Sequence, residues 1–428
     1  MNLKNKNVFV YGLGKSGKAC INFLNKQNAN VFVYDDNTSL KKEYKNFVDG
    51  NFDFTKLDLA ILSPAIYCGA IFEKLKSLKI PTINEIQLAY EFFKGKFIAV
   101  TGTNGKTTTV SLLGEIFKRA NFDCVVCGNI GVPLISLYER DNKEKIYILE
   151  ISSFQLEYVT SFKPYVSCIL NIAPDHLNRH KTMENYERIK FSICKNQSRN
   201  DFLVLNENLK EASKKYKIKP KRKLFGRGGV CEEKNGIVNY NNNFVLHKSM
   251  VKLLGEKNLE NVLASIIVAK IFKIKNEIIE DVVYEFTSLE HRIEFVAKIG
   301  GISFINDSKS TNVASTLCAL ECFKSKSVVL LVGGIGKKED YSKIFGYDNL
   351  KCVVCYGDAK DEIYDCGLNK NFDKMLKAKN LKDAFEKAYV LSCENDFVLL
   401  SPACASFDEF SGFEERGRCF KEFVNEKK

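Results

Sequence analysis

The feature that most constrains the fold is an alternation of apolar, strand-like runs with helical stretches along most of the chain. Each run ends at a polar or glycine-containing loop, as at Gly12 after residues 7–10 and at Gly102 after residues 96–100. Parallel strands need a long crossover between them, and this crossover is usually a helix. The alternation therefore predicts an α/β protein whose sheets are mainly parallel and covered by helices.

The chain has 428 residues, more than one hydrophobic core usually serves, so two or three domains are expected. The expected strands fall into three groups: 7–10, 31–34, 59–62 and 80–82; then 96–100, 146–149, 168–171 and 202–205; then 302–305, 328–332, 352–356 and 397–400. Residues 206–256 carry short alternating runs that favour a peripheral antiparallel piece. The breaks between groups predict domains at 1–93, 94–288 and 289–428.

Composition excludes several classes of function. The net charge of +12 is spread along the chain with no basic stripe interleaved with aromatic residues, so we expect no nucleic-acid partner. There is no apolar run of about 18 residues and no signal peptide, so we expect a cytoplasmic protein that does not cross a membrane. The 15 cysteines lie mostly in apolar runs, which is typical of buried free thiols. The CxxC pairs at 124–127 and 352–355 lie in strand-like runs, where both thiols cannot easily chelate one metal.

The strongest local motif is TGTNGKTT at residues 101–108, between an expected strand and an expected helix. In this context the backbone N–H groups of a glycine-rich turn and of the helix N-terminus bind phosphate oxygens. Lys106 would reach the terminal phosphates and the Thr107 hydroxyl would bind Mg²⁺. Val100 stands where a standard phosphate loop has its first glycine. The predicted ATP-binding loop consists of Gly102, Thr103, Asn104, Gly105, Lys106, Thr107 and Thr108.

A second glycine-rich loop, GLGKSG at residues 12–17, has the spacing of a dinucleotide-binding turn. Asp35 ends the next apolar run, close to where an acidic residue would take the ribose of a nicotinamide cofactor. On these residues alone, an NAD-dependent dehydrogenase stays open as an alternative to an ATP-dependent enzyme.

Further polar loops follow other expected strands. Glu150 ends the run 146–149, and its carboxylate is a hard oxygen ligand that suits Mg²⁺. The third group of strands is followed by the segments 306–312, 333–337 and 400–406. Because the carboxyl ends of parallel strands share one edge of a sheet, these loops predict a ligand-binding rim.

Taken in order, the motifs resemble those of the ATP-dependent Mur ligases, and within them the branch that adds D-glutamate. The resemblance covers nearly the whole chain. It is carried by GLGKSG at 12–17, TGTNGKTTT at 101–109, GNIG at 128–131, EISSFQLE at 150–157, DSKSTN at 307–312, SPACASFDEF at 401–410 and GFEERG at 412–417.

The resemblance implies three domains: a Rossmann-like N-terminal domain for a UDP-substrate, a central P-loop-type ATPase domain and a Rossmann-like C-terminal domain for the incoming amino acid. It implies UDP-substrate contacts at Lys15, Ser16, Asp35, Ser63, Pro64 and Asn129. It adds Asn258, Asn261, Arg292 and Asp307 to the ATP site, and implies D-glutamate contacts at Lys309, Thr311, Lys337, Ser406 and Phe413.

The resemblance also implies the catalytic set Lys106, Glu150, His176 and Lys190. One or two Mg²⁺ ions would be held by Thr107, Glu150, His176 and Lys190, the last as a carbamate whose oxygens can bind the cation. The implied activity is the joining of D-glutamate to UDP-N-acetylmuramoyl-L-alanine through an acyl phosphate, with release of ADP and phosphate, in peptidoglycan synthesis. We expect a monomer. A folylpolyglutamate synthase-like ligase stays as the nearer alternative, since it would share the ATP loop.

Overall fold

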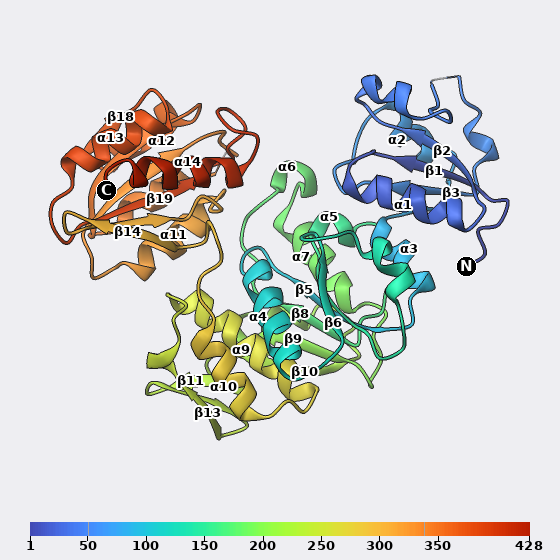
Figure 1. The fold of residues 1–428 in the computed structure, drawn as a ribbon, viewed down its shortest axis with the longest axis horizontal. Coiled ribbons are helices and arrows are strands. Elements are labelled where there is room, and N and C mark those ends of the chain that lie inside the picture. Colours follow the sequence, from blue (N-terminus) through green and yellow to red (C-terminus); the bar gives the residue numbers. More distant parts are fainter. Residues whose placement is uncertain (50, 338) are drawn as a thin grey trace. The chain divides into compact units, whose positions relative to one another are not determined.

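The computed structural model describes residues 1–49, 51–337 and 339–428, whose strands form three sheets (Figure 1). Contacts group the chain into two compact units. Unit 1 comprises Met1–Ile172, Leu177–Lys248 and Glu260–Val283, and unit 2 comprises Ala173–His176, Ser249–Leu259 and Tyr284–Lys428. The predicted α/β class is confirmed, whereas the domain boundaries near residues 93 and 288 stay predictions.

The first sheet of unit 1 is four-stranded and parallel, in the order β2-β1-β3-β4. Its two faces follow from the alternation of side chains along β1: Val8 and Val10 belong to one apolar cluster, while Phe9 and Tyr11 belong to another. The elements are β1 (Asn7–Tyr11), α1 (Lys15–Lys26), β2 (Asn30–Tyr34), β3 (Leu59–Leu62), α2 (Ala70–Ser77), β4 (Thr82–Ile83) and α3 (Glu85–Phe92).

The second sheet of unit 1 has nine strands in the order β13-β12-β11-β10-β9-β8-β5-β7-β6. Strands β5 to β10 pair in parallel, and β11, β12 and β13 pair antiparallel, so the expected antiparallel piece lies at one edge. The strands are β5 (Lys96–Thr101), β6 (Cys124–Gly128), β7 (Ile146–Glu150), β8 (Val166–Ile169), β9 (Phe202–Asn206), β10 (Lys221–Phe225), β11 (Cys231–Lys234), β12 (Ile237–Tyr240) and β13 (Asn243–His247). The helices that accompany it are α4 (Lys106–Arg119), α5 (Ser153–Leu156), α6 (Leu177–His180), α7 (Met183–Phe191), α8 (Lys210–Ser213), α9 (Glu256–Ile271) and α10 (Asn276–Glu285).

Unit 2 holds a six-stranded sheet in the order β14-β15-β19-β16-β17-β18, parallel except for the β14–β15 pair. Alternate residues of β16 point to opposite faces: Leu330 packs with residues of α11 and α12, and Leu331 packs with residues of α13 and α14. Unit 2 therefore has helices on both faces of its sheet. The elements are β14 (Glu294–Ile299), β15 (Ile302–Asn306), α11 (Val313–Cys322), β16 (Val328–Gly333), β17 (Leu350–Tyr356), α12 (Lys360–Leu368), β18 (Met375–Lys377), α13 (Leu381–Leu391), β19 (Phe397–Ala403) and α14 (Phe413–Asn425).

Short 3₁₀ helices occur in the connections of both units. They are η1 (Thr38–Glu43), η2 (Phe54–Lys56), η3 (Leu134–Arg140), η4 (Ser192–Cys194), η5 (Glu207–Leu209), η6 (Lys248–Met250) and η7 (Tyr341–Gly346).

Candidate functional site

The glycine-rich loop between β5 and α4 has the strand–loop–helix context that the sequence predicts. Gly105 precedes α4 with a φ of +85°, a left-handed conformation that favours glycine. A Cβ atom there would lie 2.2 Å from Oδ1 of Asn261, so this asparagine of α9 lies directly against the loop. The contact brings Asn261, expected at the ATP site, to the N-terminus of α4.

Asn171, which follows β8, fixes the loop from the other side. Its Oδ1 accepts a hydrogen bond from the backbone N–H of Asn104 at 2.9 Å, and its Nδ2 donates to the carbonyl of Asn104 at 3.1 Å. The N–H of Thr103 donates to the carbonyl of Asn171 at 3.0 Å. Asn171 was not among the predicted site residues, although its position at the end of the expected strand 168–171 is a signal that could have found it.

The first two side chains of α4 project from the loop in different directions. Lys106 Nζ donates to the carbonyls of Gly102 and Thr103, both at 2.8 Å, which holds the ammonium over the loop. Thr107 Oγ1 donates to Oε2 of Glu150 at 2.8 Å. The ammonium of Lys106 and the hydroxyl that pairs with Glu150 therefore both come from the first two residues of α4.

Glu150 at the end of β7 is buried, with 2% of its surface exposed. Its second oxygen, Oε1, accepts a hydrogen bond from Asn129 Nδ2 at 2.8 Å. The structure thus places Asn129, expected at the UDP-substrate, against the carboxylate beside the phosphate loop. Among the described residues, the side chain of Asn129 bonds to Glu150 and makes no hydrogen bond with the first sheet.

Lys190 of α7 reads in the sequence as a surface lysine, but only 1% of it is exposed. Its Nζ donates to the carbonyl of Gly102 at 2.9 Å and lies 4.6 Å from the centre of the Tyr186 ring. The hydroxyls of Tyr186 and Thr103 are 3.2 Å apart. Lys190 therefore contacts the phosphate loop through the carbonyl of Gly102, and its role there stays a prediction.

The carboxyl ends of β1, β2 and β3 meet at the rim of the first sheet. Gly12 has a φ of +96°, and a Cβ there would lie 2.5 Å from Cβ of Ser63, so these two loops are in contact. Asp35 accepts hydrogen bonds from the N–H groups of Leu13 at 2.7 Å and Asn37 at 2.9 Å. Lys15 is exposed and Ser16 is half-buried at the start of α1, and Pro64 follows Ser63. The predicted residues of the first sheet therefore do share one rim.

In unit 2, Asp307 is buried at the end of β15 and links three loops. It accepts hydrogen bonds from Ser310 Oγ at 2.5 Å, Ser401 Oγ at 2.8 Å and the N–H of Ile293 at 3.2 Å. Burial raises its pKa to about 6, against the lowering effect of these hydrogen bonds. Ile293 has a φ of +47°, which is strained for a β-branched residue, and it is adjacent to the predicted Arg292.

The residues expected to bind D-glutamate lie on the loops that follow β15, β16 and β19 and at the start of α14. Lys309 Nζ lies 3.4 Å from the centre of the Phe413 ring. Thr311 is half-buried just before α11, and Ser406 is buried. Lys337 Nζ lies 3.4 Å from Oδ1 of Asp175.

Arg416 of α14 is fully buried and connects the loops that follow β15 and β19. Its guanidinium donates to Ser308 Oγ at 3.0 Å, to the Ser308 carbonyl at 2.8 Å and to the Cys404 carbonyl at 3.1 Å. Among the residues that the structure describes, no carboxylate forms an ion pair with it. Arg416 was not among the predicted site residues, although it lies in the GFEERG motif at 412–417.

His176 and Asp175 also belong to unit 2. His176 has a φ of +55°, and its Nε2 lies 3.4 Å from Oδ2 of Asp175. Asp175 accepts a hydrogen bond from Asn312 Nδ2 at 3.2 Å. Asn258 belongs to the same unit and donates through Nδ2 to the Leu254 carbonyl at 2.8 Å. Asp175 is a further residue that the predicted set missed.

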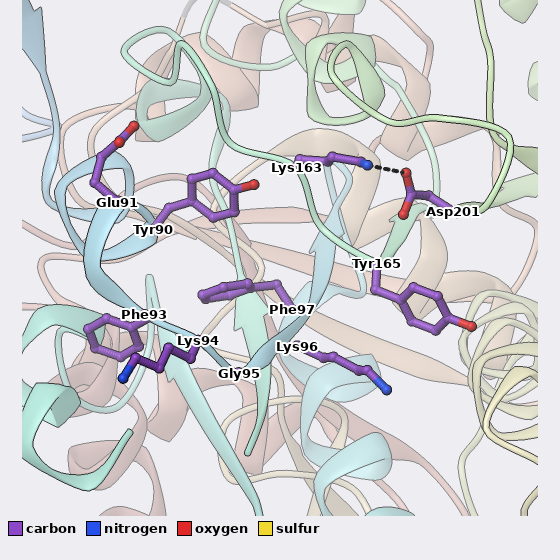
Figure 2. A pocket seen from close by; sticks show the side chains of 10 residues that line it. All are labelled: Tyr90, Glu91, Phe93, Lys94, Gly95, Lys96, Phe97, Lys163, Tyr165 and Asp201. Atoms are coloured by element: carbon purple, nitrogen blue, oxygen red, sulfur yellow. Dashed lines mark ion pairs between the residues drawn. The ribbon is translucent and has the colours of Figure 1, made fainter. Parts of the chain in front are cut away.

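A hollow of about 390 Å³ opens elsewhere on unit 1, and Figure 2 shows the side chains that line it. It lies at the amino ends of β5, β8 and β9, where Lys96, Tyr165 and Asp201 line it and Lys163 pairs with Asp201 at 3.2 Å. The phosphate loop follows the carboxyl end of β5, so this hollow is not the predicted nucleotide site.

Comparisons with known proteins agree with the order of the motifs. The profile of the Mur ligase middle domain matches residues 100–269, and that of the Mur ligase glutamate ligase domain matches residues 291–404. The UDP-N-acetylmuramoylalanine–D-glutamate ligase of Caldicellulosiruptor bescii is 40% identical over 452 residues, covering 100% of this chain and 99% of that protein. The protein of the same name from Clostridioides difficile strain 630 is 39% identical over 449 residues, covering 99% of both.

The chain belongs to the Mur ligase family. Solved structures with the same fold include the MurF ligase of Thermotoga maritima in complex with ADP, with a TM-score of 0.65, 16% identity and coverage of 100% of this chain and 96% of that one. The pseudomurein peptide ligase type C of Methanothermus fervidus has a TM-score of 0.63 at 20% identity, covering 99% and 100%. These likenesses support the fold of this Mur ligase, and the predicted family is confirmed.

In the described residues of this Mur ligase, no helix is long and apolar enough to cross a membrane. In the same ranges, no group of three or more His, Cys, Asp or Glu side chains could hold a metal ion. The predicted Mg²⁺ ligands include a threonine and a lysine, so the second result does not test them.

Proposed function

We propose that the chain joins D-glutamate to UDP-N-acetylmuramoyl-L-alanine and converts ATP to ADP and phosphate in doing so, as a step of peptidoglycan synthesis. The observation that carries this proposal is full-length identity of about 40% to relatives that bear the name of this ligase. We also propose that the enzyme acts in the cytoplasm and as a monomer.

The phosphate loop is the proposed ATP site. Lys106 and the N-terminus of α4 would neutralise the terminal phosphates, and Thr103, Asn104, Thr108 and the two loop glycines would surround them. Asn261 lies against Gly105 and would fix the nucleotide beside the loop. Asn258, Arg292 and Asp307 complete the proposed nucleotide contacts.

Mg²⁺ fits the oxygen donors beside the loop. Thr107 Oγ1 and Glu150 Oε2 are 2.8 Å apart, and hydroxyl and carboxylate oxygens are the hard ligands that this cation prefers. His176, and Lys190 as a carbamate, complete the proposed set. The bound cation would neutralise charge on the phosphates as the phosphoryl group transfers. Lys190 lies within reach of the loop for this role, because its buried Nζ donates to the carbonyl of Gly102.

The two remaining substrates are proposed to bind at the rims of the other sheets. Lys15, Ser16, Asp35, Ser63, Pro64 and Asn129 would contact the UDP-substrate. Lys309, Thr311, Lys337, Ser406 and Phe413 would contact D-glutamate, where lysine ammonium groups and hydroxyls suit a substrate with two carboxylates.

The proposed reaction has two steps. The alanine carboxylate of the UDP-substrate attacks the γ-phosphorus of ATP, and the bond to the β–γ bridging oxygen breaks to release ADP. The amine of D-glutamate then attacks the carbonyl of the acyl phosphate, a proton leaves the nitrogen, and phosphate departs. Lys106 stabilises charge on the transferring group in the first step, which is mainly positioning and electrostatics.

The test is phosphate release from ATP in the presence of UDP-N-acetylmuramoyl-L-alanine, with D-glutamate, with L-glutamate and with neither. We expect release to depend on D-glutamate and to be abolished in Lys106→Ala. A matched control is Lys118→Ala, which removes an exposed lysine at the far end of the same helix. Release that ignores D-glutamate, or that requires a folate substrate, would refute the proposal. Binding of a nicotinamide cofactor in place of ATP would favour the dehydrogenase alternative.

A further inference from the structure

Arg179 of α6 joins elements of unit 1 that lie far apart in the sequence. Its guanidinium forms an ion pair with Glu157, which directly follows α5, and Nε donates to Oε2 of that carboxylate at 3.1 Å. Nη1 donates to the backbone carbonyl of Pro64 at 2.5 Å, on the loop between β3 and α2 of the first sheet. Only 5% of the Arg179 side chain is exposed.

Two aromatic rings enclose the same guanidinium. Its central carbon lies 4.9 Å from the centre of the Tyr67 ring and 4.2 Å from that of Phe154. Tyr67 belongs to the Pro64 loop, and Phe154 belongs to α5. The Pro64 loop thus contributes a carbonyl and the Tyr67 ring, and the α5 region contributes a carboxylate and the Phe154 ring. The planar guanidinium of Arg179 is therefore contacted by both segments.

Glu157 is in turn fixed by a second buried residue. His180 Nδ1 lies 3.2 Å from Glu157 Oε1, and His180 Nε2 lies 2.9 Å from Ser153 Oγ. Burial raises the pKa of Glu157, but the nearby side chains of His180 and Arg179 outweigh it, so the pKa is lowered overall. The carboxylate is therefore a charged and rigid anchor for Arg179.

We propose that Arg179 is a positioning residue for the UDP-substrate, which it serves by fixing the Ser63–Pro64 loop to the segment that follows Glu150. This inference rests on the proposed function, which places the UDP-substrate at Ser63 and Pro64. Arg179 need not touch the substrate, because its hydrogen bond to the Pro64 carbonyl sets where that backbone lies. Among the described residues, the phosphate loop makes no hydrogen bond or ion pair with Arg179, so the effect is selective for one substrate.

The chemistry of the side chain makes a sharp test possible. Lysine keeps the positive charge near the two rings, but its single ammonium cannot reproduce the fork that engages Glu157 and Pro64 together. Methionine keeps the apolar stem and loses the charge. Arg188→Ala is the matched control, since Arg188 lies on the neighbouring helix α7 and is exposed, and its side chain donates to Asn185 Oδ1 at 2.7 Å.

The experiment measures kcat and the three KM values for the full chain and for Arg179→Lys, Arg179→Met and Arg188→Ala. Binding of UDP-N-acetylmuramoyl-L-alanine without ATP is measured by calorimetry alongside. We expect Arg179→Lys to raise KM and Kd for the UDP-substrate about tenfold, as the loss of a charged hydrogen bond does. The KM values for ATP and D-glutamate should change less than about twofold, and Arg179→Met should have the larger effect.

Three outcomes distinguish whether Arg179 positions the UDP-substrate. A selective rise in KM and Kd for the UDP-substrate supports the inference, and thermal unfolding of each variant separates it from a general loss of stability. Equal changes in all three KM values, or wild-type behaviour of Arg179→Lys, would overturn it while leaving the proposed function intact. A wild-type protein that neither binds UDP-N-acetylmuramoyl-L-alanine nor releases phosphate with it would instead refute the proposed function, and the inference with it.

Discussion

Glu85, at the start of α3, offers a quantitative test of how a buried carboxyl group controls stability. Only 4% of the residue is exposed, and its Oε1 accepts a hydrogen bond from the N–H of Ile135 at 2.6 Å. Burial raises the pKa of Glu85 from its ordinary value of 4.5 to about 7, although backbone hydrogen bonds from Ile135 and Leu134 oppose the rise. The folded protein therefore holds a proton here that the unfolded chain releases.

The sign of the pH effect follows from this difference. Between pH 4.5 and about 7 the folded state binds more protons than the unfolded state at this site, so the free energy of unfolding falls as pH rises. The stability contribution is fully present below 4.5 and is lost once pH passes the folded-state value. One pKa unit corresponds to about 1.4 kcal/mol, so the loss amounts to about 3 kcal/mol.

The perturbation is Glu85→Gln, which keeps the shape and the acceptor oxygen but cannot ionise. We expect the free energy of unfolding of the variant, relative to wild type, to be higher at pH about 8 than at pH about 4.5, by about 3 kcal/mol. The assay is urea unfolding followed by far-ultraviolet circular dichroism, because the chain has no tryptophan. If the units unfold separately, the transition of unit 1 is compared.

A control for the loss of one negative charge is Glu73→Gln, on the exposed surface of α2. The neighbouring thiols of Cys20 and Cys127 do not interfere, because burial raises their pKa values far above this range. Parallel stability curves for wild type and Glu85→Gln across the whole range would refute the reasoning. A difference in the free energy of unfolding, variant minus wild type, that falls as pH rises would refute it more strongly.

Three further predictions concern the proposed sites. Lys190→Ala should lose activity and recover part of it with added short carboxylates, measured as phosphate release; full activity without them would exclude the carbamate. Gly105→Ala should lose ATP binding by calorimetry, because its Cβ would meet Asn261 Oδ1 at 2.2 Å in a left-handed backbone; wild-type affinity would contradict the tight loop. Arg416→Lys should lower the free energy of unfolding, measured in urea, by about 3 kcal/mol, because the buried carbonyls of Ser308 and Cys404 lose hydrogen-bond donors. An unchanged urea midpoint of unfolding would show that these carbonyls are satisfied by other donors.

The sequence by itself determined the architecture around the phosphate loop, because the deciding signals there are local. The apolar run that becomes β5, the glycines after it and the helical stretch that becomes α4 lie within about 25 consecutive residues. Strand alternation likewise placed polar residues at the carboxyl ends of parallel strands, as at Glu150, the last residue of β7. The edge strand β14 and its antiparallel pairing with β15 escaped prediction, since the short run 294–299 carries no strong period.

Only the tertiary structure decided which of these residues meet. Lys190 lies on an ordinary helical stretch of the sequence, yet in the structure it is buried and bonds to the carbonyl of Gly102. Asn129 donates a hydrogen bond to Glu150, and Arg179 donates one to the carbonyl of Pro64, 115 positions away in the sequence. Such contacts depend on how sheets and helices pack, and the free energy of that packing is shared among many distant residues. A local sequence pattern can therefore predict the chemistry of a loop, but the residues that its side chains contact are determined by the whole fold.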